Sequence, residues 1–235
     1  MTKKSLNLSK TTGEVLSRRA AVTDIAIVAA FMVTLNWVTL GITESYAGPI
    51  TASCAVVLIT MLFWRRGMRW RDHGLRRPTR PRLLFAQVPV VLVAWLTISA
   101  VAAFLVGQYL PKPDTSARFG DLAGNIPGTL WWIGIAWLIG GFAEEMIFRG
   151  FLLNRLAALL PRGTLGSIMA VLLQAALFGA VHVYNRGLFG FLVLGAVGLV
   201  LGTSYLVLRR NLWPLILAHG LGNTLGFLAR YFDLK

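Results

Sequence analysis

The stretch IAWLIGGFAEEMIFRGFLL, residues 135–153, is a long apolar run with Glu144, Glu145 and Arg149 near its centre. An ionised side chain at the centre of a bilayer costs about 2.5–3.5 kcal/mol on the insertion scale. Three such groups in six residues would therefore cost roughly 8–10 kcal/mol if they faced lipid. The stretch is accordingly predicted to be a transmembrane helix whose polar side faces other helices or an internal cavity.

The whole chain has the composition of an integral membrane protein. Of its 235 residues, 56% are hydrophobic and 14% are charged, whereas soluble domains carry about 25% charged residues. The net charge is +14, but the arginines cluster at the ends of apolar runs. This placement fits contact with anionic inner-leaflet lipid, so membrane lipids are expected partners and nucleic acid is not.

Apolar runs recur along the chain, and crossing a bilayer takes about 20 helical residues. The runs lie at residues 20–42, 48–64, 83–110, 129–159, 165–184, 188–208 and 212–230. The predicted fold class is therefore all-α, a polytopic transmembrane helical bundle of about seven spans in a single membrane domain. The first run is longer than a signal-peptide core and is expected to stay attached. The fourth is too long for one perpendicular span and is expected to tilt, kink at Gly140-Gly141 or extend beyond the membrane.

Basic residues give the predicted orientation. The connection 65–82 carries eight arginines and one acidic residue, and residues 1–19 are also basic, so both are expected in the cytoplasm. The 111–128 loop then falls outside. Residues 20–128 are assigned as N-terminal transmembrane helices with this Arg-rich connection, and residues 129–230 as a catalytic transmembrane core.

The spacing of the charged residues predicts different roles for the two adjacent glutamates. Glu145 and Arg149 are four residues apart, share a helix face and are expected to form a supporting ion pair. Glu144 lies about 100° further round the helix and is left without that partner. Glu144 is therefore the candidate for chemistry.

Two of the three histidines lie in apolar runs. His182 is near the end of the fifth run, and His219 lies in the seventh, four residues before Asn223. His219 and Asn223 share a helix face and are expected to line one site with Glu144 and His182. The third histidine, His73, lies in the Arg-rich connection and is expected to be solvated.

This set of side chains allows two chemistries. A carboxylate helped by an imidazole can act as a general base on water, while the other histidine and the asparagine stabilise an oxyanion. Alternatively, two histidines and one glutamate can bind zinc and leave a coordination position open for water. Glu144, His182 and His219 would then be the metal ligands and Zn²⁺ the cofactor, whereas the first chemistry needs no cofactor. The residues alone leave both open.

Three motifs, in this order, resemble those of the CPBP family, the CAAX-protease and bacteriocin-processing family. They are Glu144-Glu145-x-x-x-Arg149, Phe178-x-x-x-His182 and His219-x-x-x-Asn223. The resemblance covers about residues 129–230. It implies an intramembrane endopeptidase that cleaves near the C-terminus of a membrane-associated peptide or protein, by either a metal-dependent or a glutamate-based mechanism.

By this resemblance, Glu144 and His182 would activate the water, and His219 and Asn223 would form the oxyanion site. Three further residues would hold the geometry, namely Glu145, Arg149 and Phe178. The resemblance also implies a cavity open toward the cytoplasmic side. The compact size and the Arg-rich loops indicate a bacterial cytoplasmic membrane.

Two other functions are compatible with buried polar groups. In a proton-coupled transporter, glutamates and histidines relay protons, but no inverted repeat of broken helices is evident. A non-catalytic scaffold or immunity protein of the same fold has no need to keep such costly groups in the membrane.

One tension concerns His182. The predicted orientation places it toward the outer end of its helix, away from Glu144. The two residues meet only if that helix starts deep in the membrane or if residues 185–187 form a turn buried below the outer surface, where protein or water surrounds the backbone.

The predicted orientation is testable with topology reporters. A reporter inserted within residues 65–82 should read cytoplasmic, and one within residues 111–128 should read external, because arginine-rich connections are retained in the cytoplasm. The opposite pair of readings would invert the orientation of the whole chain.

Overall fold

The computed structural model describes residues 17–78, 81–114 and 116–234, and within these residues the chain is helical without strands. The N-terminal elements are α1 (Arg18–Leu40), α2 (Glu44–Arg65), the 3₁₀ helix η1 (Trp70–His73), α3 (Pro81–Gly107) and α4 (Ser116–Phe119). The remaining elements are α5 (Ile126–Ala136), the π-helices η2 (Trp137–Glu144) and η3 (Met146–Leu153), α6 (Asn154–Leu159), α7 (Thr164–Ala180), α8 (Val183–Val207) and α9 (Trp213–Tyr231). The predicted all-α class is confirmed.

Hydropathy located the long helices to within a few residues. All seven predicted runs are helical, and the segments from α5 to α6 form one continuous helix over Ile126–Leu159. By length and composition, five helices of the described residues can cross a membrane: α1, α2, α3, Ile126–Leu159 and α8. Large apolar side chains such as Phe85, Val90 and Phe104 are exposed on the outside of the bundle. An apolar outer surface of this kind is suited to lipid contact.

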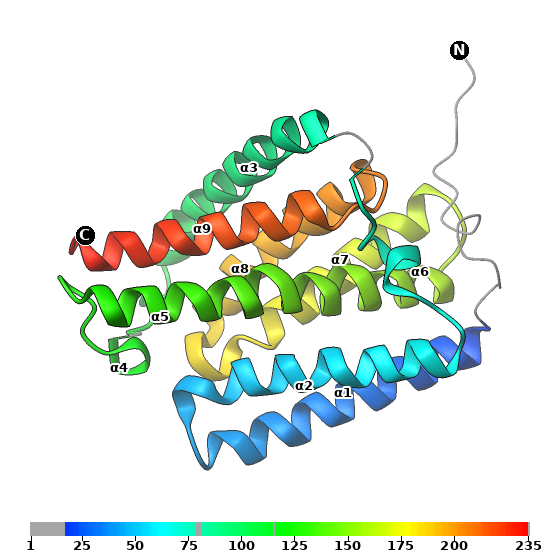
Figure 1. Cartoon of the computed structure of the whole chain (residues 1–235), viewed down its shortest axis with the longest axis horizontal. Coiled ribbons are helices and arrows are strands. Elements are labelled where there is room, and N and C mark those ends of the chain that lie inside the picture. Colours follow the sequence, from blue (N-terminus) through cyan, green and yellow to red (C-terminus); the bar gives the residue numbers. More distant parts are fainter. Residues whose placement is uncertain (1–16, 79–80, 115, 235) are drawn as a thin grey trace.

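The two ends of the bundle are formed by different segments of the chain (Figure 1). The Arg-rich connection between α2 and α3 lies at one end together with α6, whereas α4 and the C-terminus lie at the other. The α1–α2 hairpin lies on one side of the long Ile126–Leu159 helix, and α9 and α3 lie on the other. The site described below is reached by following the long helix inward from either end.

At the end with the Arg-rich connection, two arginines share one buried acidic residue. Asp24 of α1 is fully buried, and its two carboxylate oxygens accept hydrogen bonds from Arg66 at 2.7 Å and Arg155 at 3.1 Å. The Arg155 guanidinium also lies over the rings of Phe63 and Phe151, at 5.0 and 5.2 Å from their centroids. Asp24 therefore ties α1, α2 and the long helix together.

The prediction that His73 is solvated is wrong. Its side chain is only 2% exposed, because the connection folds back and stacks the imidazole on Phe63 at 4.2 Å. Burial lowers the pKa of His73 to about 4, so the ring is neutral near pH 7 and can accept a hydrogen bond from Arg155, whose Nη1 is 3.4 Å from Nε2. The Arg-rich connection is thus an ordered part of the fold rather than a loop in solvent.

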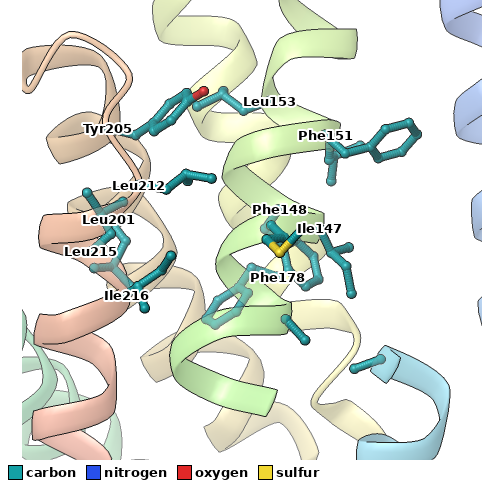
Figure 2. Packing of buried hydrophobic residues seen from close by; sticks show 14 of the residues in the cluster. Ile147, Phe148, Phe151, Leu153, Phe178, Leu201, Tyr205, Leu212, Leu215 and Ile216 are labelled. Atoms are coloured by element: carbon teal, nitrogen blue, oxygen red, sulfur yellow. The ribbon is translucent and has the colours of Figure 1, made fainter. Parts of the chain in front are cut away.

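One part of the hydrophobic core lies between the long helix and the α7, α8 and α9 helices (Figure 2). Phe148 and Phe178 meet edge to face with ring centroids 4.9 Å apart, and Ile147 lies beside them. Leu201, Leu215 and Ile216 close the core from α8 and α9. The polar site is built directly onto this packed interface.

Replacing the buried acid tests the network at this end. Asp24→Asn keeps the shape of the side chain but leaves Arg66 and Arg155 without a counter-charge, so the variant should lose about 3–5 kcal/mol of stability. Thermal unfolding of the purified protein in detergent measures this loss. The matched control is Asp121→Asn on the exposed 120–125 connection, which should change stability by less than about 0.5 kcal/mol. Equal unfolding temperatures for the two variants would contradict the role of Asp24.

Candidate active site

The long helix changes its winding where the two glutamates lie. Residues Trp137–Glu144 and Met146–Leu153 are π-helical, and Glu145 lies between these two stretches. Extended π-helical segments are rare, and short ones occur frequently at functional sites. The π-helical stretch from Trp137 to Leu153 includes Gly140-Gly141, the position at which a kink was expected.

Glu145 accepts two hydrogen bonds through one of its carboxylate oxygens. Its Oε1 accepts hydrogen bonds from Arg149 Nη1 at 2.9 Å and from His219 Nδ1 at 2.8 Å, and Glu145 and Arg149 are both fully buried. The Arg149 guanidinium lies over the Phe178 ring at 4.6 Å. The ion pair expected from the spacing is therefore present, and it also orients His219. Because an ionised carboxylate can only accept, His219 carries its proton on Nδ1 and presents Nε2 to the other glutamate.

Glu144 lies between the two histidines without bonding directly to either. Its Oε1 is 4.0 Å from His182 Nε2, and its Oε2 is 3.9 Å from His219 Nε2. Both distances are too long for a hydrogen bond, and a separation of this kind can be bridged by a water molecule. The Glu144 side chain is 20% exposed, so it is the accessible carboxylate of the pair.

His182 is held by the end of its own helix. Its Nδ1–H donates to the Phe178 carbonyl at 2.7 Å, which leaves the lone pair of Nε2 directed toward Glu144. Helix α7 ends at Ala180, and α8 begins at Val183 with a non-helical residue at Gly187 (φ 57°, ψ −158°). The turn after His182 is therefore level with Glu144 inside the bundle, which resolves the tension that the predicted orientation left.

Asn223 and His219 occupy space that a glycine provides. A Cβ on Gly140 would overlap the Asn223 Nδ2 atom and would come within 3.4 Å of His219 Nε2. Beside it, Gly141 lets η2 approach the α9 backbone at Ile216 and Gly220. The absence of two side chains on η2 thus allows the His219 and Asn223 side chains to lie beside Glu144.

One cavity of about 720 Å³ joins these groups, and all four predicted catalytic residues line it. From Glu144, the cavity extends along α1 between Ile25 and Leu40 and reaches Arg118 and Phe119 at the α4 end. Most of its wall is apolar. The polar site therefore lies in the middle of the bundle, in a cavity that extends from it toward Ile25 and Leu152 in one direction and toward Arg118 and Phe119 in the other.

Sequence reasoning missed several residues of this cavity. Trp95 of α3 packs edge to face against His219, with ring centroids 5.0 Å apart. Arg118 and Arg186 line the cavity from α4 and from the start of α8. Only Arg186 carried a signal in the sequence, since it lies four residues after His182 and so on the same helix face.

The same residues can be tested as a metal site. Two histidines and one glutamate form a zinc donor set, and hydrogen bonds from both Nδ1 atoms would orient such ligands. In the described part of the chain, however, no three His, Cys, Asp or Glu side chains are grouped closely enough to hold a metal ion. The Glu144 carboxylate lies 4.0 Å from His182 Nε2 and 3.9 Å from His219 Nε2, separations that a water molecule can bridge.

Comparison with protein families agrees with this site. Residues 126–225 match the model of the family described as type II CAAX prenyl endopeptidase Rce1-like. The chain carries an Rce1-like domain. The domain runs from the start of α5 into α9 and includes Glu144, His182, His219 and Asn223. The match to this family supports the interpretation of the chain as a membrane protease. Comparisons with curated proteins and with solved structures gave no match.

The glycine that accommodates Asn223 gives a sharp test of the geometry. If Asn223 donates to an oxyanion, as the resemblance implies, Gly140→Ala should displace its amide and lower peptide cleavage by at least about tenfold, because a misplaced oxyanion donor stabilises the transition state poorly. The matched control is Gly134→Ala on the same helix, where an added Cβ meets no atom within 4 Å. Turnover and unfolding temperature of both variants are the measurements. A fully active Gly140→Ala protein would show that Asn223 has no part in catalysis.

Proposed function

We propose that the chain is an intramembrane endopeptidase in which Glu144 and His182 activate a water molecule and His219 and Asn223 stabilise the oxyanion. The observation that carries this proposal is the position of the Glu144 carboxylate, 4.0 and 3.9 Å from two imidazole Nε2 atoms within one cavity. These distances leave room for a water molecule in contact with the carboxylate. A substrate carbonyl entering the cavity would meet that water.

Water activation is assigned to the carboxylate and the imidazole that have free acceptor atoms. Glu144 forms no hydrogen bond with another described side chain, and His182 presents a lone pair at Nε2 because its Nδ1–H is held by Phe178. Glu144 accepts a proton as the water oxygen attacks the carbonyl carbon, and His182 Nε2 accepts the second hydrogen bond of the water. When the tetrahedral intermediate collapses, the C–N bond breaks and the proton passes from Glu144 to the leaving amine, which restores the Glu144 carboxylate.

Oxyanion stabilisation is assigned to His219 and Asn223. Glu145 accepts from His219 Nδ1 at 2.8 Å, which orients the imidazole so that Nε2 lies beside Glu144. With a proton on Nε2, His219 is an oxyanion donor, and Asn223 has an amide donor one helical turn further along α9. Both donors act mainly when charge develops on the carbonyl oxygen.

The wall of the cavity supports a proposal for the class of substrate. Its wall along α1 consists of apolar side chains including Val28, Met32 and Trp37. Such a wall suits the apolar part of a membrane-associated peptide or of a chain attached to it. We therefore assign the substrate as a membrane-delivered peptide or protein cleaved near its C-terminus.

The side of entry depends on the orientation of the chain. The cavity is lined from Ile25 and Leu152, on the side of the Arg-rich connection, to Arg118 and Phe119 at the α4 end. A cytoplasmic Arg-rich connection makes the Arg118 end of the cavity the external one, and the inverted orientation makes it the cytoplasmic one. The topology reporters within residues 65–82 and 111–128 distinguish the two.

Glu144→Gln tests the function directly. The amide keeps the shape but cannot take a proton, so cleavage of membrane peptides should fall by about 10²–10⁴-fold without loss of folded protein. The matched control is Glu44→Gln, the same change at an exposed position in the first turn of α2, which should cleave like the unaltered chain. Hydrolysis by Glu144→Gln at the unaltered rate would remove this residue from the mechanism.

Three further measurements separate the mechanisms. His219→Ala and Asn223→Ala should lower kcat by about 10²–10³-fold with a smaller change in KM, since an oxyanion donor acts in the transition state. Peptide cleavage should survive exhaustive chelation. A loss of cleavage that only added metal restores would establish a metal mechanism instead.

A transport assay tests the alternative function. A proton flux that vanishes in Glu144→Gln, with no peptide cleavage by the unaltered chain, would identify a transporter.

A further inference from the structure

Two arginines line the cavity without a carboxylate partner. Arg118 comes from α4 and Arg186 from the start of α8. The Nε atom of each is buried and has no hydrogen-bond partner, and neither guanidinium forms an ion pair with any carboxylate of the described residues. Buried donors are normally paired, and those left open at a cavity are candidates for contact with a ligand.

The charge around these arginines favours an anion. The charges of Arg118 and Arg230 act repulsively on Arg186, and that of Glu144 acts attractively. Arg118 and Arg230 lie against the same Phe119 ring, at 5.4 and 5.0 Å from its centroid. Among the residues that line the cavity, Glu144 is the single carboxylate against Arg118 and Arg186. This part of the cavity therefore carries a net positive charge before a substrate binds.

The basic pair lies close to the reacting groups. The backbone N–H of Arg186 donates to the His182 carbonyl at 3.0 Å, so the two residues are one helical turn apart and lie on one helix face. Both Arg186 and Arg118 act electrostatically on His182. An extended peptide advances about 3.3–3.6 Å per residue. An anion held by these side chains is thus within a few residues of a carbonyl attacked beside Glu144.

We propose that Arg118 and Arg186 bind the C-terminal carboxylate of the peptide substrate and so fix which bond is cleaved. This inference rests on the proposed endopeptidase function. A guanidinium matches the planar, two-oxygen geometry of a carboxylate, and a free C-terminus is the anion that every peptide carries at a set distance from a bond near its end. The scissile bond is then chosen by distance from the C-terminus rather than by side-chain sequence alone.

The test compares one peptide in two forms, binding to the full chain carrying Glu144→Gln so that no cleavage intervenes. The probe is an N-acylated fluorescent peptide made with a free C-terminal carboxylate or with a C-terminal amide. The acid should bind at least about tenfold more tightly than the amide, as expected for a hydrogen bond to a charged group. Adding Arg186→Gln or Arg118→Gln should lower the affinity for the acid to that of the amide and leave the amide unchanged.

The control arginine is Arg162, which is exposed in the connection between α6 and α7. Arg162→Gln should preserve the preference for the acid. Equal binding of acid and amide by the Glu144→Gln chain overturns the proposal, and this comparison needs no arginine variant to fold. Arginine variants that lose binding to nanodiscs of anionic phospholipid while keeping the acid preference would also overturn it, because the site would then hold a lipid headgroup.

The outcome is separable from that of the proposed function. An otherwise unaltered chain that cleaves acid and amide peptides equally would retain the endopeptidase function and lose the carboxylate site. A chain that prefers the acid in binding but cleaves no peptide would retain the carboxylate site and lose the endopeptidase function.

Discussion

The site depends on one buried carboxylate oxygen, Glu145 Oε1. It accepts hydrogen bonds from Arg149 on its own helix and from His219 on α9. A buried arginine without a counter-charge would be strongly destabilising, so the position of the Glu145 side chain is fixed by electrostatics and not only by packing. His219 is fixed with it, and Phe178 beneath Arg149 links the pair to α7 and to His182. Three helices are thereby held around Glu144.

The two neighbouring glutamates have different roles because their surroundings differ. Glu145 points into the protein and is neutralised, so it holds geometry and orients an imidazole. Glu144 points into the cavity with space for water between it and both histidines. The same side chain, displaced by one residue along a π-helical segment, can thus support the site in one case and carry the proposed chemistry in the other.

Local features of the site could be predicted from the sequence, and contacts between helices could not. The spacing of Glu145 and Arg149 gave their ion pair because residues four apart meet on any helix. The contact between Glu145 and His219 joins positions 74 residues apart, so it depends on how α9 packs against η2. His73 was placed in solvent because its neighbours in the sequence are basic, whereas the aromatic ring that buries it belongs to α2. Periodicity predicts which residues share one face of a helix. It does not predict which residues of another helix that face contacts.

Four arginines of the described residues form two pairs whose positions have different explanations. Arg149 and Arg155, the two most deeply buried, each have a carboxylate partner, Glu145 and Asp24 respectively. These pairs satisfy charges that the fold itself has buried. Arg118 and Arg186 have no such partner in the described part of the chain, yet they line the cavity that contains Glu144. Since the fold supplies an acid where burial demands one, the missing acid beside this pair is best explained by an anion that arrives with the substrate.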